Sequence, residues 1–143
     1  MGKSIKIISK LKRIENYLKQ HYHENKQNDG YDIKNRQEND NGYISIYYFR
    51  HKKSGCVVRI HHWIDNTLSI DLLISERAGN RYADICESAI EKFKNLFDEQ
   101  PQHDSNFLIN NKPKPYNRYW FDITTEYDEK IFSRLEKIIE TLS

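Results

Sequence analysis

Three stretches of the chain repeat apolar residues every three or four positions, which is the spacing that places them on one face of a helix. They are residues 4–22, 80–98 and 127–142. In the first stretch, basic residues occupy most of the positions between the apolar ones. The spacing predicts three amphipathic helices, each with one apolar face to bury.

Five shorter stretches are rich in β-branched and aromatic residues and end at turn residues, which is typical of strands joined in hairpins. They are 43–50, 56–64, 67–75, 106–110 and 116–124. The order of elements is therefore α-βββ-α-ββ-α. It indicates a two-layer α+β fold, with an antiparallel sheet of about five strands and the three helices mostly on one face. A chain of 143 residues fits a single domain, 1–143.

Residues 23–42 break both patterns. Asn, Asp, Gln and Gly dominate this stretch, and only Tyr31 and Ile33 have side chains suited to burial. The composition predicts a polar loop or linker. Because about twenty residues exceed the usual length of a connection, a functional segment or a short unrecognised element is the alternative.

The alternation within the strands separates two unlike sheet faces. We expect Arg50 opposite Cys56, and a three-residue turn over 65–67 that gathers one aliphatic row under the helices. That row consists of Ile44, Ile46, Val58, Ile60, Leu68, Ile70, Leu72 and Ile74. The second hairpin should add Phe107, Ile109, Tyr119, Phe121 and Ile123.

The opposite face carries aromatic and charged residues, and in this register His61 lies directly across from Asp71. Tyr, Trp and Arg are enriched at protein interfaces, and the same residue types stack nucleobases on open sheets. The face is therefore expected to meet a partner, unless 23–42 or the first helix folds over it. The candidate binding residues are Tyr43, Tyr47, Arg59, His61, Trp63, Asp71, Arg118 and Trp120.

The formal net charge of +2 conceals an uneven distribution of charge. Basic residues gather in the first helix and at the tips of both hairpins, whereas acidic residues gather in the later helices. The tip lysines would contact phosphates if the partner were a nucleic acid; otherwise they protect the sheet edges from aggregation. These lysines are Lys52, Lys53, Lys112 and Lys114.

Catalytic and metal-binding patterns are weak. No Gly-rich phosphate loop and no zinc-ligand spacing are found, so we expect neither a cofactor nor a metal. The one enzymatic interpretation is metal-free phosphodiester cleavage, with His61 as general acid–base and Arg59 as a phosphate clamp.

The two cysteines, Cys56 and Cys86, are too few for a disulfide framework. They predict reduced thiols in a cytoplasmic protein, and a redox pair is the alternative. No apolar run approaches the length of a membrane span.

The order α-βββ-α-ββ-α resembles the type III secretion chaperone fold, which implies a dimer that wraps an extended segment of a partner. The stretch 56–142 is also similar to an uncharacterised domain attached to predicted nucleases of bacterial defence systems. Neither resemblance carries a functional residue to this chain.

The leading functional expectation is a non-catalytic binding or adaptor protein of a bacterial or phage system, defence-related or chaperone-like. It would act through the aromatic face, as a homodimer or with a protein partner and without a membrane. A nucleic-acid-binding domain that uses the same face is the second interpretation, and the RNase-like hydrolase is the third.

Overall fold

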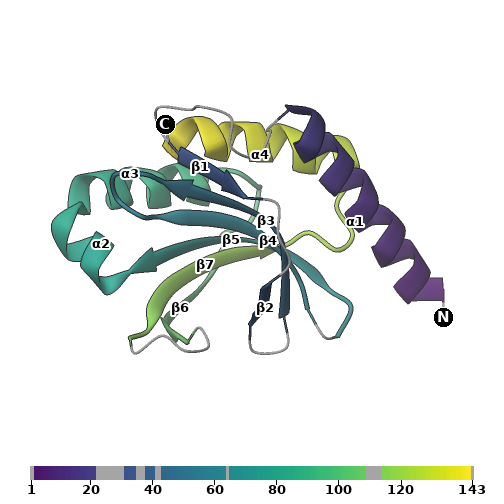
Figure 1. Ribbon diagram of the computed structural model, residues 1–143, viewed down its shortest axis with the longest axis horizontal. Helices are drawn as coiled ribbons and strands as arrows, with labels where there is room; N and C mark the ends of the chain where they lie inside the picture. Colours follow the sequence, from purple (N-terminus) through teal and green to yellow (C-terminus); the bar gives the residue numbers. More distant parts are fainter. Residues whose placement is uncertain are drawn as a thin grey trace.

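Helices cover one face of an antiparallel sheet in the computed structural model (Figure 1). The structure describes residues 2–21, 31–34, 38–40, 43–63, 65–108 and 114–142, with side chains at 7, 9–21, 50–63, 65–108 and 114–137. In chain order, the elements are α1 Gly2–His21, β1 Tyr31–Lys34, β2 Glu38–Asp40, β3 Tyr43–His51, β4 Val57–His62, β5 Leu68–Ser75, α2 Glu76–Arg81, α3 Ala83–Lys94, β6 Gln102–Phe107, β7 Tyr116–Asp122 and α4 Asp128–Leu142.

The sheet runs in the order β1-β3-β4-β5-β7-β6, with β2 also paired to β3, and every pairing is antiparallel. The α+β fold with helices on one face is confirmed, and the five expected strands form most of the sheet. The other two strands, β1 and β2, lie within 23–42, where the sequence predicted a loop or linker. β1 has four residues and β2 consists of Glu, Asn and Asp, so each is too short or too polar for an alternating pattern to identify it. The alternative, a short unrecognised element in this stretch, is therefore confirmed.

Two elements differ from the prediction. The expected helix 80–98 is divided at Tyr82 into α2 and α3, and α2 begins at Glu76 because the Ser75 Oγ accepts a hydrogen bond from the Ala78 N–H at 3.1 Å. The expected strand 106–110 is also displaced, since β6 ends at Phe107. Its last two residues, 109–110, lie outside the described part of the chain.

The β3–β4 pairing contains a bulge between Ser45 and Tyr47. Before it Ile44 pairs with His62, the partner that the predicted register implies; after it Arg50 pairs with Val57 rather than with Cys56. The turn causes the shift, because the His51 N–H donates to the Cys56 carbonyl at 2.8 Å and Gly55 adopts a φ of +77°.

The β4–β5 pairing confirms the aliphatic row but not the individual partners. Ile60 pairs with Ile70, and all the described members of the row are buried. Arg59, not His61, pairs with Asp71, so that prediction is wrong by two residues, a shift that leaves each residue on the same face. The turn fixes this register: the Trp63 N–H donates to the Thr67 carbonyl at 2.9 Å, and Asn66 has a φ of +62°.

The core lies between the aliphatic row and one face each of α1, α3 and α4 (Figure 1). Aromatic rings join the layers, since Phe121 of β7 contacts Phe93 and Phe97 at centroid distances of 5.1 and 4.5 Å. Lys10 of α1 ties this layer to the segment before α4, because its Nζ donates to the Thr124 carbonyl at 3.0 Å and to the Glu126 carbonyl. Because the helices cover the aliphatic face of the sheet, a site on the sheet can lie only on the opposite face.

Both cysteines are buried in this core as free thiols, and their Sγ atoms lie 3.2 Å apart. Burial and the hydrogen bond with Cys56 raise the pKa of Cys86 to about 12. We therefore expect the thiols to react with a disulfide reagent such as DTNB at least about tenfold more slowly in the folded protein than in urea. Equal rates in the two conditions would show that a thiol is accessible.

Candidate functional site

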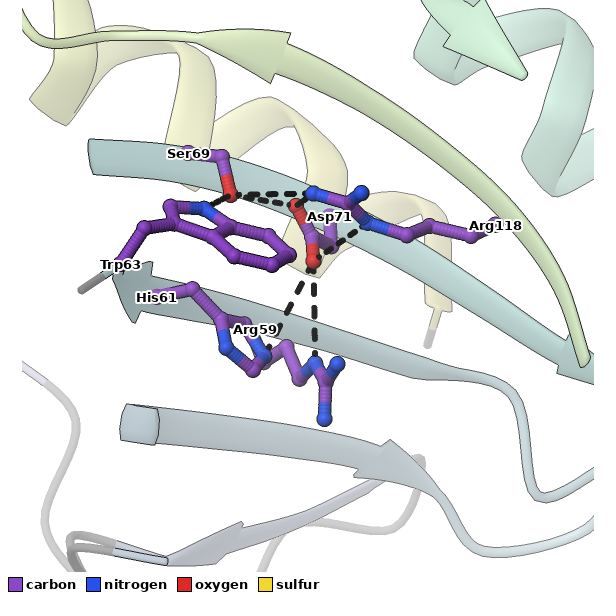
Figure 2. Close-up of polar contacts among 6 residues, drawn as sticks. All are labelled: Arg59, His61, Trp63, Ser69, Asp71 and Arg118. Atoms are coloured by element: carbon purple, nitrogen blue, oxygen red, sulfur yellow. Dashed lines mark hydrogen bonds and ion pairs between the residues drawn. The ribbon is translucent and has the colours of Figure 1, made fainter. Parts of the chain in front are cut away.

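The face of the sheet away from the helices is centred on Asp71, a carboxylate that is completely buried (Figure 2). Arg118 holds it with two hydrogen bonds: Nε donates to Oδ2 at 3.0 Å and Nη2 donates to Oδ1 at 3.2 Å. The Arg59 Nε and the His61 Nε2 each lie 3.8 Å from the same Oδ2. One carboxylate therefore lies among two guanidinium groups and an imidazole.

Ser69 connects this charged group to Trp63. Its hydroxyl donates to Asp71 Oδ1 at 2.7 Å and accepts from the indole Nε1–H of Trp63, also at 2.7 Å (Figure 2). The Arg118 Nη2 approaches the same hydroxyl oxygen at 3.4 Å. The hydrogen bonds fix the orientation of the indole relative to the sheet.

Strand alternation explains why these side chains meet. Ser69 and Asp71 are two residues apart on β5, as Arg59 and His61 are on β4, so each pair lies on one face. The register then sets Arg59 across from Asp71 and places Arg118 of β7 beside it, paired with Leu73. Five residues of three adjacent strands thus converge on one place, and we call Arg59, His61, Ser69, Asp71 and Arg118 the charged cluster.

Aromatic rings cover the charged cluster. The Arg118 guanidinium carbon lies 4.3 Å from the ring centroid of Trp63, 3.9 Å from that of Trp120 and 5.1 Å from that of Phe107. Phe107 also packs with Val57 and Leu73 in a second apolar cluster. Phe107 was predicted on the helical face, but the irregularity in β6 after Asp104 precedes it, and it lies on this one.

Burial sets the protonation states. It lowers the pKa of His61 to about 3, against the opposing effect of Asp71, so His61 is neutral at pH 7. Burial by itself would raise the pKa of Asp71, but His61, Arg118 and Arg59 together with the Arg118 hydrogen bonds outweigh it and lower that pKa. At neutral pH the charged cluster thus contains two cations and one anion.

The expectation of an open face is wrong for four of the candidate residues. Arg59 is 3% exposed, Arg118 6%, and His61 and Asp71 are 0% exposed. They are shielded by the aromatic rings above them, which the strand pattern alone could not place. A general acid–base at His61 and a phosphate clamp at Arg59 would have no contact with a substrate, so the geometry does not support the hydrolase.

Trp63 and Trp120 are only partly buried and border a pocket of about 260 Å³. That is many times the roughly 10–15 Å³ that one ordered water needs. The pocket lies over the start of β5, between the β4–β5 turn and the end of β7. Its lining consists of Trp63, Asp65, Thr67, Leu68, Ser69, Arg118, Trp120 and Asp122.

The lysines proposed to contact phosphate lie elsewhere. Lys52 and Lys53 are exposed in the β3–β4 turn, and the exposed Lys114 precedes β7, 4.0 Å from Glu76. Both positions are at the opposite end of the strands from Trp63. The six residues of β4 place the β3–β4 turn about 20 Å from Trp63. The structure therefore does not bring these lysines and the tryptophans together.

The side chains of the candidates Tyr43, Tyr47 and Lys112 lie outside the described part of the chain. The backbone of Tyr47 is described, and it pairs with Ile60.

The carboxylates of the pocket were not among the candidate residues predicted from the sequence. Asp65 belongs to the predicted turn over 65–67, and Asp122 belongs to the predicted strand 116–124. No spacing signal could have joined them, because they are 57 residues apart in the chain and meet only through the β5–β7 pairing. Asp122 pairs with Ser69, and this pairing brings the end of β7 next to the start of β5.

Within the described residues, no group of His, Cys, Asp and Glu could hold a metal ion. No helix among them has the length and apolar character to cross a membrane. Comparisons with protein-family models, with curated proteins and with solved structures give no match to the chain. The pocket and the charged cluster beneath it are therefore the features that bear on function.

Proposed function

We propose that this is a non-catalytic binding protein that engages a protein partner, a second copy of the chain or another protein, at the pocket between Trp63 and Trp120. The single observation that carries the proposal is that buried residues of the charged cluster hold two partly exposed indoles in place beside a pocket. Trp63 is held by the Ser69 hydroxyl, and both rings stack on the Arg118 guanidinium, which Asp71 anchors. Rigid aromatic side chains beside a pocket are typical binding hot spots.

The nucleic-acid interpretation is the second candidate, and two observations weigh against it at this pocket. The exposed carboxylates of Asp65 and Asp122 would repel a phosphate backbone. The nearest described hairpin-tip lysines are at the other end of the strands. A nucleic acid on the basic end alone would not use the tryptophans.

Light scattering at low and high salt, with absorbance read at 260 and 280 nm, tests the proposal. A mass of twice 17.3 kDa that salt does not reduce would support self-association. Trp120→Ala should then restore the monomer, whereas the control Tyr127→Ala, which truncates an aromatic residue 79% exposed and outside the pocket, should not. Excess 260 nm absorbance that salt removes would contradict the proposal and favour nucleic acid.

If the wild type is monomeric and free of nucleic acid, a foreign partner is expected. Immobilised wild-type protein and both variants would then be used to capture partners. A protein retained by the wild type and by Tyr127→Ala, but lost with Trp120→Ala, would support the pocket as the binding site. Equal retention by all three proteins would contradict it.

A further inference from the structure

The pocket carries two carboxylates whose position is fixed by hydrogen bonds from the residues that follow them. The Asp65 Oδ1 accepts from the Thr67 N–H at 3.1 Å and from its hydroxyl at 2.7 Å. The Asp122 Oδ1 accepts in the same way from the Thr124 N–H at 2.9 Å and from its hydroxyl at 2.5 Å. Neither carboxylate forms an ion pair with any residue that the structure describes.

The charges around the pocket favour a cation. Asp65, Asp122 and Arg118 line it, and Arg118 is already paired with Asp71 and stacked between the two indoles. The Lys10 ammonium, which binds the Thr124 and Glu126 carbonyls, also interacts electrostatically with Asp122 but forms no ion pair with it. An anion entering the pocket would approach the two exposed carboxylates, whereas a cation would neutralise them.

We propose that the pocket receives an arginine side chain of a protein partner; this inference rests on the function proposed above. The two indoles already stack on the guanidinium of Arg118, so their chemistry suits a planar cation. Arginine presents five N–H donors in a flat fork, which lets one side chain both lie against an indole and donate to the carboxylates. A lysine ammonium would satisfy the charge but not the stacking.

The probe is acetyl-Gly-Arg-Gly-amide, compared with the same peptide carrying citrulline, which has the shape of arginine without its charge. Binding is followed by the intrinsic fluorescence of the protein's two tryptophans. We expect the arginine peptide to bind at least about tenfold more tightly than the citrulline peptide, because charge-assisted hydrogen bonds are the stronger ones. Equal affinity of the two peptides, or binding of neither, would overturn the inference.

Asp65→Asn and Asp122→Asn provide variants that remove one charge each and keep the Oδ1 atom that accepts the turn hydrogen bonds. Each should weaken arginine binding about tenfold and leave the weak citrulline affinity unchanged. Asp98→Asn is the matched control, because it removes an exposed carboxylate outside the pocket lining and should change nothing. An unaltered preference for arginine in both pocket variants would overturn the assignment of the carboxylates.

The failure of this inference can be told apart from the failure of the proposed function. If a partner complex depends on Trp120 while the arginine peptide does not bind, the pocket is an interface but the arginine assignment is overturned. If a single-stranded oligonucleotide binds with quenching of the tryptophans and the arginine peptide does not, both proposals are overturned. Binding of the arginine peptide that Trp120→Ala abolishes supports both.

Discussion

Replacing Asp71 by Asn is expected to lower the free energy of unfolding by about 3–5 kcal/mol. The substitution keeps the volume of the side chain but removes the carboxylate that pairs with the buried Arg118 and lies 3.8 Å from the Arg59 Nε. The buried Arg118 guanidinium would then lose the carboxylate that holds it with two hydrogen bonds, which is far costlier than losing a surface ion pair. Urea unfolding followed by circular dichroism measures the effect.

Asp98→Asn serves as the control for this prediction, because Asp98 is exposed. Its removal should alter stability by less than about 0.5 kcal/mol. A loss below about 1 kcal/mol for Asp71→Asn would mean that water reaches the charged cluster. The description of the face as closed would then be wrong.

Acidification from pH 7 to pH 4 is expected to cost about 3 kcal/mol of stability through His61 alone. Its pKa is about 3 in the folded protein and near 6.5 when unfolded, so between these values the unfolded chain binds more protons. Stability is therefore fully present above pH 6.5 and declines as the pH falls toward 3. The lowered pKa of Asp71 acts in the same direction at the acid end of this range.

Unfolding free energies measured from pH 7 to pH 4 test this prediction. His61→Asn should flatten the pH dependence by about the amount stated, whatever its effect on stability at pH 7. His103→Asn is the matched control, because it removes an exposed imidazole that stacks on Tyr119 at the sheet edge, away from the charged cluster. Identical pH profiles for the wild type and His61→Asn would show that His61 is not buried as a neutral imidazole.

The division of the sheet into two faces could be predicted from the sequence because burial constrains it strongly. Val58, Ile60, Ile70 and Leu72 alternate with polar residues, and a one-residue slip would have placed all of them on the wrong face. The even shift from His61 to Arg59 as the partner of Asp71 was not predicted, since it preserves the faces. Such a shift depends on how the Trp63–Thr67 turn closes, which the hydrophobic pattern does not encode. The irregularities in β3 and β6 were not predicted either.

The closure of the second face could not be predicted, and the reason is physical. A strand carrying Arg59, His61 and Asp71 has the pattern of a solvent-facing surface, because isolated charges are rarely buried. Burial becomes acceptable only when the charges pair and rings cover them. The covering rings, Trp120 and Phe107, come from distant segments of the chain, so the cover is visible only once β7 and β6 are in place.

The candidate site was consequently predicted in part. Trp63 and Trp120 were named as binding residues and do border the pocket, whereas four of the other candidates form its buried support. The carboxylates of Asp65 and Asp122 emerged only from the pairing of β5 with β7. The sequence therefore located the face, and the structure located the pocket within it.

The most direct test of the binding site uses the indole N–H signals of the protein. Because the chain has two tryptophans, a ¹H–¹⁵N correlation spectrum contains two such signals, assigned with Trp63→Phe and Trp120→Phe. We expect acetyl-Gly-Arg-Gly-amide to shift both signals in a saturable manner, and the citrulline peptide to need an at least about tenfold higher concentration for the same shift. If neither signal moves, or if both peptides shift them equally, the pocket does not bind arginine as proposed.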